Sequence, residues 1–326
     1  MRRFYKMQLI KPDRVILVTG ACGQIGTELV RTLRERYGRP CVIATDIFPE
    51  RTSFFEDGLY MFLDVMDGSA IRKVICERGV THIYHLAAIL SANGEQNPKD
   101  AWEINMNGLL NILEAAKNNH VQQVFWPSSI AVFGPASTKN NCPQDALPDP
   151  ATVYGISKLA GEYWCRYYHD QYGLDVRSLR YPGLISHSAK AGGGTTDYAV
   201  EIFHKAISDG TYECFLRENT NLPMMYMKDA VRAAIELMEA SLEKVSKVNS
   251  YNVAGMSFTP LELASEINTY VNNFKITYKP DHRQRIADSW PYFINDSQAR
   301  EDWGWMPQYN MFTMTRDMMA KLTKNR

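Results

Sequence analysis

Residues 15–26 read VILVTGACGQIG, a short apolar run followed by glycines at positions 20, 23 and 26. In a strand–turn–helix unit, Gly20 would permit the tight turn and Gly26 would let the helix pack closely on the strand. Gly23 would let the backbone approach a pyrophosphate, which the free N–H groups of the helix would face. The stretch therefore predicts a dinucleotide-binding turn. Its expected contacts are Gly20, Cys22, Gly23, Gln24, Ile25 and Gly26.

Short β-rich runs alternate with helical stretches through the first half of the chain. Strands are expected over 15–19, 41–45, 59–63, 81–86, 123–126 and 175–180, and helices over 25–36, 70–78, 105–118 and 154–172. This alternation predicts an α/β fold with a doubly wound parallel sheet. Ligands are then expected at the edge where the strands end.

The pattern loosens after Tyr181, and consecutive glycines at 192–194 indicate a mobile loop that could hinge a lid. A further helix is expected over 228–241. We expect a dinucleotide-binding domain over 1–183, to which 229–254 returns. The segments 184–228 and 255–326 are expected to form a smaller C-terminal α/β lobe that binds the substrate.

The charges balance, with 36 Lys and Arg against 36 Asp and Glu among 326 residues. A balanced chain gives no reason to expect a nucleic-acid or membrane-surface partner. The six cysteines form no CxxC motif and no cluster with histidine, so no metal site is expected. The basic start, MRRFYK, lacks the apolar segment of a secretory signal and is compatible with a short organelle presequence or a solvated tail.

Asp46 ends the second expected strand, twenty residues after Gly26. A carboxylate there accepts hydrogen bonds from the ribose hydroxyls of NAD and would repel the 2′-phosphate of NADP, so the sequence favours NAD. Two later strand ends are expected to flank the cofactor. They supply Asp64 and Val65 near the adenine, and Leu86, Ala87 and Ala88, of which the small residues let the cofactor lie against the backbone.

Tyr154 and Lys158 open a long expected helix, and their spacing places both side chains on one face. Oxidation of a secondary alcohol needs a base for the hydroxyl proton, and a tyrosine with an ordinary pKa of about 10 is a poor base at neutral pH. A nearby ammonium group and a cationic nicotinamide would favour the phenolate. Ser129, at the end of the fifth expected strand, would orient the substrate oxygen.

These motifs, together with the run RYPG at 180–183, resemble the extended short-chain dehydrogenases, a family that includes NDP-sugar epimerases. The resemblance covers nearly the whole chain. It implies that Tyr154 is the base, Lys158 its partner and Ser129 the third catalytic residue, with Asn105 in a structural or proton-relay role. It also implies that Tyr181, Gly183 and Leu184 contact the nicotinamide end of NAD.

The C-terminal half narrows the resemblance to one branch of this family. The runs DSWP at 288–291 and WGW at 303–305 are similar to the tail of short-chain L-threonine 3-dehydrogenases. This resemblance implies NAD-dependent oxidation of the β-hydroxyl of L-threonine to 2-amino-3-ketobutyrate, without a metal. It also implies a pocket for the amino acid. The pocket residues would be Ser91, Gly94, Ser129, Tyr154, Thr195 and Trp290.

Two other functions use the same fold. An NDP-sugar epimerase or dehydratase would share the three catalytic residues, and a non-catalytic NAD-sensing module typically lacks the tyrosine–lysine pair. The family resemblance also implies a homodimer in which the 154–172 helix joins a four-helix interface. The chain is expected in the mitochondrial matrix of a eukaryote, and otherwise in the cytoplasm.

Overall fold

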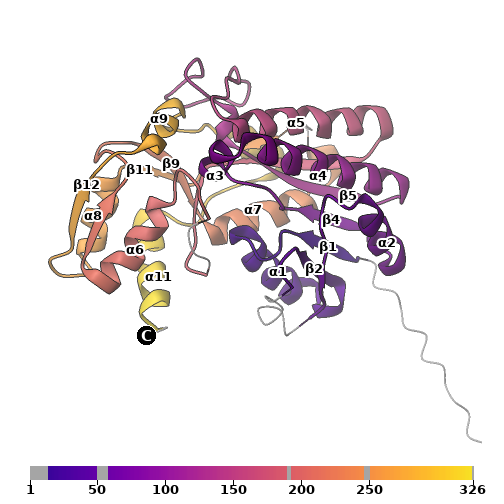
Figure 1. The fold of residues 1–326 in the computed structure, drawn as a ribbon, viewed down its shortest axis with the longest axis horizontal. Coiled ribbons are helices and arrows are strands. Elements are labelled where there is room, and N and C mark those ends of the chain that lie inside the picture. The colour runs from indigo at the N-terminus through magenta and orange to yellow at the C-terminus, as the bar shows by residue number, and fades with distance from the viewer. Residues whose placement is uncertain (1–13, 50–57, 189–191, 246–249, 325–326) are drawn as a thin grey trace, which may run out of the picture.

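A seven-stranded parallel sheet forms the centre of the larger part of the molecule (Figure 1). The computed structural model describes residues 14–49, 58–188, 192–245 and 250–324. The strand order is β10-β6-β5-β4-β1-β2-β3, and all neighbours are parallel. The strands are β1 (Ile16–Thr19), β2 (Val42–Asp46), β3 (Tyr60–Phe62), β4 (His82–His85), β5 (Gln123–Ser129), β6 (Asp175–Tyr181) and β10 (Tyr251–Asn252). The predicted doubly wound parallel sheet is confirmed.

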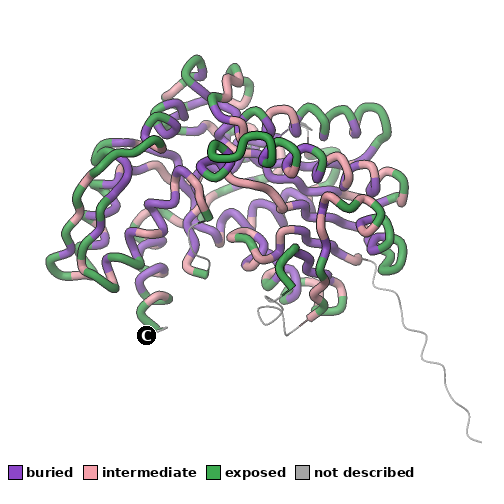
Figure 2. The backbone as a smooth tube through the Cα atoms, viewed as in Figure 1, coloured by how far each residue is buried: buried purple, intermediate pink, exposed green. Residues whose placement is uncertain are grey.

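Helices cover both faces of this sheet. Successive side chains of a strand point to opposite faces, and both faces of these strands are apolar and must be covered. Ile16 and Val18 pack in the core beneath α1 (Gln24–Tyr37) and α7 (Met227–Glu239). Leu17 lies in the opposite core, beneath α2 (Gly68–Arg78), α4 (Pro98–Asn118) and α5 (Val153–Tyr172). Figure 2 shows the resulting layers, with buried strands between helices that expose their outer turns. None of the described helices has the length and apolar composition that a membrane crossing needs.

The C-terminal part of the chain builds a smaller lobe with two sheets of its own, at the left of Figure 1. One sheet has the order β11-β9-β7 and the other pairs β12 with β8. Its strands are β7 (Gly183–Ile185), β8 (Thr211–Cys214), β9 (Leu222–Tyr226), β11 (Met256–Phe258) and β12 (Lys275–Tyr278). Its helices are α6 (Tyr198–Asp209), α8 (Pro260–Asn268), α9 (His282–Ser289) and α11 (Met311–Lys324). Their apolar faces share one core.

Two segments late in the chain pack with the large sheet. Helix α7 lies against α1, and β10 pairs with β6 at the sheet edge. This is the arrangement that a return of residues 229–254 to the first domain requires, although the domain boundaries themselves stay a prediction. The remaining helices are α3 (Ser91–Gln96) and α10 (Ser297–Trp303), with 3-10 turns at Arg39–Cys41, Ile130–Val132 and Leu242–Lys244.

The expected elements are present, and the largest difference concerns α4. This helix begins at Pro98 rather than at Asn105. Proline is favourable in the first turn because its missing N–H needs no partner there. The apolar pattern from Met106 onward predicted only the part of α4 that faces the core, whereas the first turns expose Trp102.

A buried ion pair fixes α5 on the sheet. The carboxylate of Glu162 accepts hydrogen bonds from Arg180 Nε and Nη2, each at 2.8 Å, and from Ser128 Oγ at 2.6 Å. The side chains of Glu162 and Arg180 are 3% and 8% exposed, so neither charge has water as an alternative partner. Ser128 lies in β5 and Arg180 in β6, so a single carboxylate joins α5 to two adjacent strands.

We expect Glu162→Gln to lower the free energy of unfolding by about 3–5 kcal/mol, because it leaves the buried Arg180 charge unpaired. Asp170→Asn, which breaks an exposed pair with Arg166 on the same helix, is the matched control and should cost about 0.5 kcal/mol or less. Urea unfolding followed by circular dichroism measures both. Equal losses in the two variants would show that the buried pair does not fix the helix.

Candidate active site

The glycine turn after β1 is shaped by close backbone contacts. Gly20 has φ +69°, and a Cβ atom there would lie 2.6 Å from the nitrogen of Ala87. A Cβ on Gly26 would lie 2.3 Å from the Gly20 carbonyl oxygen, so any side chain would push α1 off the sheet. Gly23 is less confined, since its added Cβ would lie 3.3 Å from that oxygen. The backbone at Gly23 is thus left bare at the start of a helix, where a pyrophosphate binds well.

Asp46 is held beside this turn by two backbone donors. Its Oδ2 accepts from Cys22 N and its Oδ1 from Ile47 N, both at 2.8 Å. The side chain is nearly buried, so its position at the end of β2 is well defined. A carboxylate fixed next to a phosphate-binding turn fits the diol of NAD and opposes a 2′-phosphate. The chemistry of this donor set therefore fits NAD.

Other residues expected to contact the cofactor lie at the strand ends beside the turn. Leu86, Ala87 and Ala88 follow β4, and the backbone of Ala87 touches Gly20. Asp64 accepts from Met66 N at 2.9 Å in the turn that precedes α2. Val65 is buried, and its carbonyl accepts from Asn111 of α4. The structure thus brings the predicted cofactor residues to one edge of the sheet.

Asn105 links the segment after β4 to α5. Its amide donates to the Ile89 carbonyl at 3.0 Å and accepts from Ile89 N at 2.8 Å. The same amide donates to Ser157 Oγ at 3.3 Å. The side chain is buried in α4, so these bonds fix the strand end relative to the helix that carries Tyr154 and Lys158. They support the structural part of its expected role.

The N-terminus of α5 lies against the turn that follows β5. Thr152 caps the helix by accepting from Gly155 N at 3.0 Å. A Cβ on Gly155 would lie 2.2 Å from the Ala131 carbonyl oxygen, which shows how closely the helix approaches. This contact brings Tyr154 to the Ser129 hydroxyl at the end of β5. Burial raises the pKa of Tyr154 to about 12, and its hydrogen bond with Ser129 opposes that shift.

Lys158 is buried one turn further along α5. Its Nζ donates to the Pro127 carbonyl at 2.7 Å and lies 5.5 Å from the centre of the Tyr154 ring. Burial lowers the pKa of this lysine to about 7. Desolvation is the largest cause of the pKa shift at both Tyr154 and Lys158. The expectation that the ammonium group and a cationic nicotinamide together favour the phenolate stays a prediction.

Two residues that are expected in the substrate pocket, and that lie far apart in the sequence, are close together in the structure. The hydroxyls of Ser91 and Thr195 lie 3.3 Å apart, and both side chains are buried. Gly94 lies in the same short helix, α3, where an added Cβ would lie 3.4 Å from Ala101 Cβ and 3.5 Å from Val153 Cγ1. The structure therefore places α3 between Thr195 and the start of α5.

The described part of the glycine-rich loop is held by hydrogen bonds, and the expected mobility of the loop stays a prediction. Gly193 N and Gly194 N donate to one carboxylate oxygen of Asp197, each at 2.7 Å. The Gly193 carbonyl accepts from Ala92 N at 3.2 Å, which joins the loop to α3. The remainder of the expected loop, residues 190–191, lies outside the described residues.

Tyr181 and Trp290 are both buried, in different cores. The Tyr181 hydroxyl donates to the Ala230 carbonyl of α7 at 2.7 Å, beneath the sheet. Strand β6 therefore turns the Tyr181 side chain into the core, and the expected contact of Tyr181 with the nicotinamide end of NAD stays a prediction. Gly183 and Leu184 begin β7 directly after it. Trp290 ends α9 in the core of the smaller lobe, against which Tyr154 also packs.

Lys139 is a residue near this site that the sequence did not reveal. Its ammonium group donates to the carbonyls of Asp288, Ser289 and Trp290, at 3.0, 2.5 and 3.2 Å. It thereby satisfies the last carbonyls of α9, which a cation at a helix C-terminus does favourably. The partners lie far apart in sequence, so no local pattern could have indicated the contact. In the part of the chain that the structure describes, no cluster of three or more His, Cys, Asp and Glu is arranged to hold a metal ion.

Comparison with known proteins agrees with this geometry. Residues 16–254 match the model of the NAD-dependent epimerase/dehydratase family. An uncharacterized epimerase/dehydratase of Staphylococcus saprophyticus is 46% identical over 306 residues, which is 93% of this chain and 95% of the relative. The chain therefore belongs to the NAD-dependent epimerase/dehydratase family.

Solved structures narrow the position of the chain within that family. The GalE-like L-threonine dehydrogenase of Cupriavidus necator, in its holo form, is 53% identical with a TM-score of 0.92, covering 94% of this chain and 99% of that one. A monomeric L-threonine 3-dehydrogenase from a metagenome is 48% identical, also with a TM-score of 0.92, covering 95% and 99%. These similarities confirm the resemblance to the L-threonine 3-dehydrogenase branch.

Proposed function

We propose that this protein oxidises the β-hydroxyl of L-threonine with NAD and forms 2-amino-3-ketobutyrate. The observation that carries the proposal is the position of Tyr154, beside Ser129 and on the same helix face as Lys158. The 53% identity to the dehydrogenase of Cupriavidus necator supports threonine as the substrate.

Each catalytic side chain has a separate task. Ser129 donates a hydrogen bond to the substrate oxygen and orients it toward Tyr154. Tyr154 Oη accepts the hydroxyl proton, as a general base in hydrogen-bond reach does. NAD, when bound, supplies the hydride acceptor and a positively charged ring. Lys158 adds positive charge beneath the tyrosine and stabilises the phenolate that burial alone disfavours.

The pocket for the amino acid is proposed at the contact of α3 with the glycine-rich loop. Ser91 and Thr195 offer buried hydroxyls, which can bind the charged ends of an amino acid by donating or accepting. Gly94, in the same helix as Ser91, lets this helix lie close to Ala101 and Val153. Trp290 is proposed to close the apolar side near the methyl group, and small hydroxyl side chains suit a substrate the size of threonine.

The two alternatives fit less well. An NDP-sugar epimerase or dehydratase would use the same three side chains. However, two solved structures that are 53% and 48% identical to this chain are L-threonine dehydrogenases. A non-catalytic NAD-sensing module has no need of a tyrosine held against a serine at the sheet edge.

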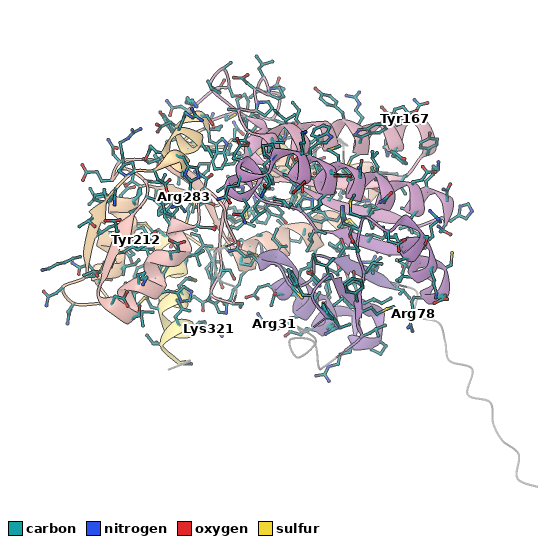
Figure 3. All side chains as sticks on the ribbon, viewed as in Figure 1. Arg31, Arg78, Tyr167, Tyr212, Arg283 and Lys321 are labelled. Atoms are coloured by element: carbon teal, nitrogen blue, oxygen red, sulfur yellow. The ribbon has the colours of Figure 1, made fainter. Side chains whose placement is uncertain are left out.

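We also propose a homodimer formed through α4 and α5. A surface groove between these helices is lined by seven residues, among them the exposed side chains of Trp102 and Ile156. Further along α5, Tyr163, Trp164 and Tyr167 expose between 38% and 58% of their surface. Figure 3 shows Tyr167 projecting at the outer edge of the molecule. Exposed aromatic residues on one face are typical of a protein interface.

The compartment is proposed to be the cytoplasm if the chain is bacterial, as its relative in Staphylococcus saprophyticus is. The six cysteines are free, which is compatible with a reducing compartment. The mitochondrial alternative depends on N-terminal residues that lie outside the described part of the chain, and it stays a prediction.

The proposed activity predicts NADH formation from NAD and L-threonine, followed by absorbance at 340 nm. Tyr154→Phe should lower kcat by about 10²–10⁴-fold, since it removes the general base without removing the ring. NADP should be a poor substitute because of Asp46. Conversion of UDP- or dTDP-sugars with no NADH from threonine would establish the epimerase alternative, and full activity of Tyr154→Phe would refute the assigned base.

The pKa shifts predict how activity depends on pH. The phenolate is the active form, so kcat/KM should be high above the pKa of Tyr154 in the NAD complex and should fall as the pH drops through it. Lys158→Met removes a stabilising charge and should move this fall to higher pH by about one unit or more. Lys205→Met, which changes an exposed lysine of α6, is the control. A pH profile that stays the same in Lys158→Met would contradict the role of the ammonium group.

The dimer predicts a loss of association when charge is placed on α5. Tyr167→Glu should convert the dimer to a monomer in sedimentation velocity experiments, because like charges would meet across the two-fold axis. Phe312→Glu, a change of similarly exposed aromatic surface on α11, should leave the dimer intact. If the parent protein sediments as a monomer, the proposed homodimer is wrong.

A further inference from the structure

The loop between β5 and α5 leads from the proposed catalytic serine to a helix of the smaller lobe. Ser129 ends β5, and the 3-10 turn Ile130–Val132 that follows it is buried in the core of the lobe. Ser137 closes the next turn, because its amide donates to the Gly134 carbonyl and its hydroxyl accepts from Gly134 N, both at 3.0 Å. Lys139 lies two residues further on. A short, hydrogen-bonded stretch thus connects Ser129 to this lysine.

The side chain of Lys139 supplies hydrogen-bond donors to the end of α9. The last carbonyls of a helix have no N–H partner within the helix. Here the carbonyls of Asp288, Ser289 and Trp290 accept from Lys139 Nζ at 3.0, 2.5 and 3.2 Å. Pro291, which follows, has no N–H of its own to offer. The ammonium group therefore replaces donors that the chain lacks at this point.

The backbone of Lys139 holds the chain on the other side of Trp290. Its carbonyl accepts from Tyr292 N at 2.7 Å and from Phe293 N at 3.3 Å. One residue thus binds the Trp290 carbonyl through its side chain and the amides after Pro291 through its main chain. The position of the Trp290 backbone relative to the loop is fixed from both sides.

Cys142 continues this attachment through backbone bonds alone. Its amide donates to the Phe293 carbonyl at 2.8 Å, and its carbonyl accepts from Asn295 N at 2.9 Å. These bonds do not depend on the Lys139 side chain and remain when that side chain is replaced. A substitution of Lys139 should therefore loosen the chain at Trp290 without releasing the loop from the lobe.

Trp290 packs in the core that also receives the loop after Ser129. Its side chain is 5% exposed, and the core includes Ala131 and Phe133. Tyr154 packs against the same core. Once the backbone of a tryptophan is fixed, only its two side-chain torsions determine where the ring lies, and close packing restricts both. The cap on α9 therefore helps to determine the place of the ring.

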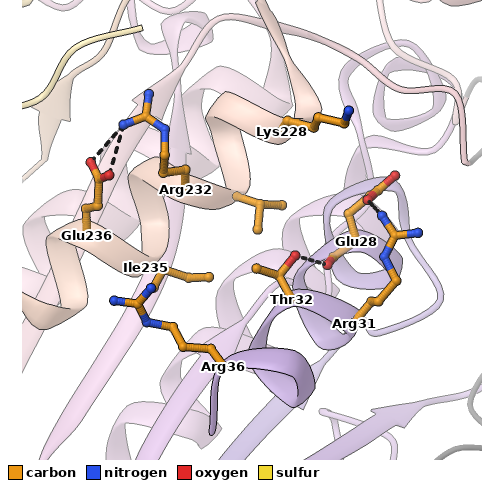
Figure 4. Close-up of a pocket in the computed structure, with 9 residues that line it drawn as sticks. Glu28, Arg31, Thr32, Arg36, Lys228, Arg232, Ile235 and Glu236 are labelled. Carbon is orange, nitrogen blue, oxygen red and sulfur yellow. Dashed lines mark hydrogen bonds and ion pairs between the residues drawn. The ribbon is translucent and has the colours of Figure 1, made fainter. Parts of the chain in front are cut away.

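The pairing of Lys139 differs from that of the cations in a groove between α1 and α7 (Figure 4). There Arg232 pairs with Glu236 at 2.9 Å, and Arg31 pairs with Glu28. The ammonium group of Lys139 instead donates to three neutral carbonyls. Its loss leaves no carboxylate without a counter-charge, so a neutral side chain at this position tests the cap and not an ion pair.

We propose that Lys139 is a positioning residue that sets the preference for the methyl group of threonine: by capping α9 it fixes Trp290 at the apolar side of the substrate pocket. The proposal rests on the proposed function, since it takes Trp290 as the residue next to that methyl group. A hydrophobic pocket distinguishes substrates that differ by one methylene by about 10–200-fold. A pocket wall that can shift accepts the longer side chain more readily.

The homologue of L-threonine with the same configuration and an ethyl group in place of the methyl group, L-2-amino-3-hydroxypentanoate, tests this role. Both compounds are secondary alcohols that undergo the same oxidation, so the ratio of their kcat/KM values reports on the pocket. The parent protein should prefer threonine by about 10-fold or more. Lys139→Met should lower this preference by about 5-fold or more and raise the KM for threonine more than it lowers kcat. Lys139→Arg, which keeps a cationic donor, should retain most of the preference.

Lys279→Met is the matched control, because Lys279 is an exposed lysine of the same lobe, 4.0 Å from Glu213. It should keep the parental preference. Trp290→Phe should lower the preference as Lys139→Met does. In the Trp290→Phe background, Lys139→Met should have little further effect on the preference, because both changes act on one wall of the pocket.

A general loss of stability lowers activity toward both alcohols equally and leaves their ratio unchanged. The proposal is overturned if Lys139→Met keeps the parental preference, or if its effect is as large in the Trp290→Phe background as in the parent. Activity on threonine with an unchanged ratio in Lys139→Met refutes the positioning role alone. If the parent forms no NADH from threonine, the proposed function fails and this proposal fails with it.

Discussion

The close approach of α5 to the large sheet is the constraint on which the active site depends. A Cβ on Gly161 would lie 2.4 Å from the ring of Trp126, and one on Gly155 would meet the Ala131 carbonyl. Glu162 of α5 keeps the helix close to the sheet, because its carboxylate accepts hydrogen bonds from Ser128 of β5 and Arg180 of β6. Because the helix lies so close to the sheet, the Lys158 side chain is buried, and its ammonium group donates to the Pro127 carbonyl.

This confinement affects the ionisation of the proposed catalytic pair, Tyr154 and Lys158. Burial disfavours the charged form of each partner, and therefore raises the pKa of Tyr154 and lowers that of Lys158. The protein alone holds a protonated phenol next to a weakly basic amine. NAD, when bound, would supply a positively charged ring, which would favour the phenolate of Tyr154. Water-excluded sites of this kind make each such charge more effective.

Short sequence patterns predicted those parts of the site whose geometry depends only on neighbouring residues. Gly20 and Gly26 follow from one strand–turn–helix unit, and Tyr154 and Lys158 from helical spacing. The partners of Arg180 and the cap that Lys139 provides depend on segments that meet only in three dimensions. The burial of the Tyr181 side chain likewise depends on α7, which packs on the sheet from late in the chain, so no local pattern revealed it.

The residues proposed to select the substrate come from a different part of the chain from those proposed to carry out the chemistry. The large sheet carries the dinucleotide turn and the three catalytic side chains, all of which an epimerase of this family would share. The residues proposed to bind the substrate are instead Ser91 and Thr195, whose hydroxyls lie 3.3 Å apart, and Trp290, in the core of the smaller lobe. The Ser188 hydroxyl, in the segment that follows β7, donates to Glu28 and joins the lobe to α1. Substrate specificity can then vary through the lobe while the hydride chemistry is retained, provided that the lobe stays aligned with the helix that receives the cofactor.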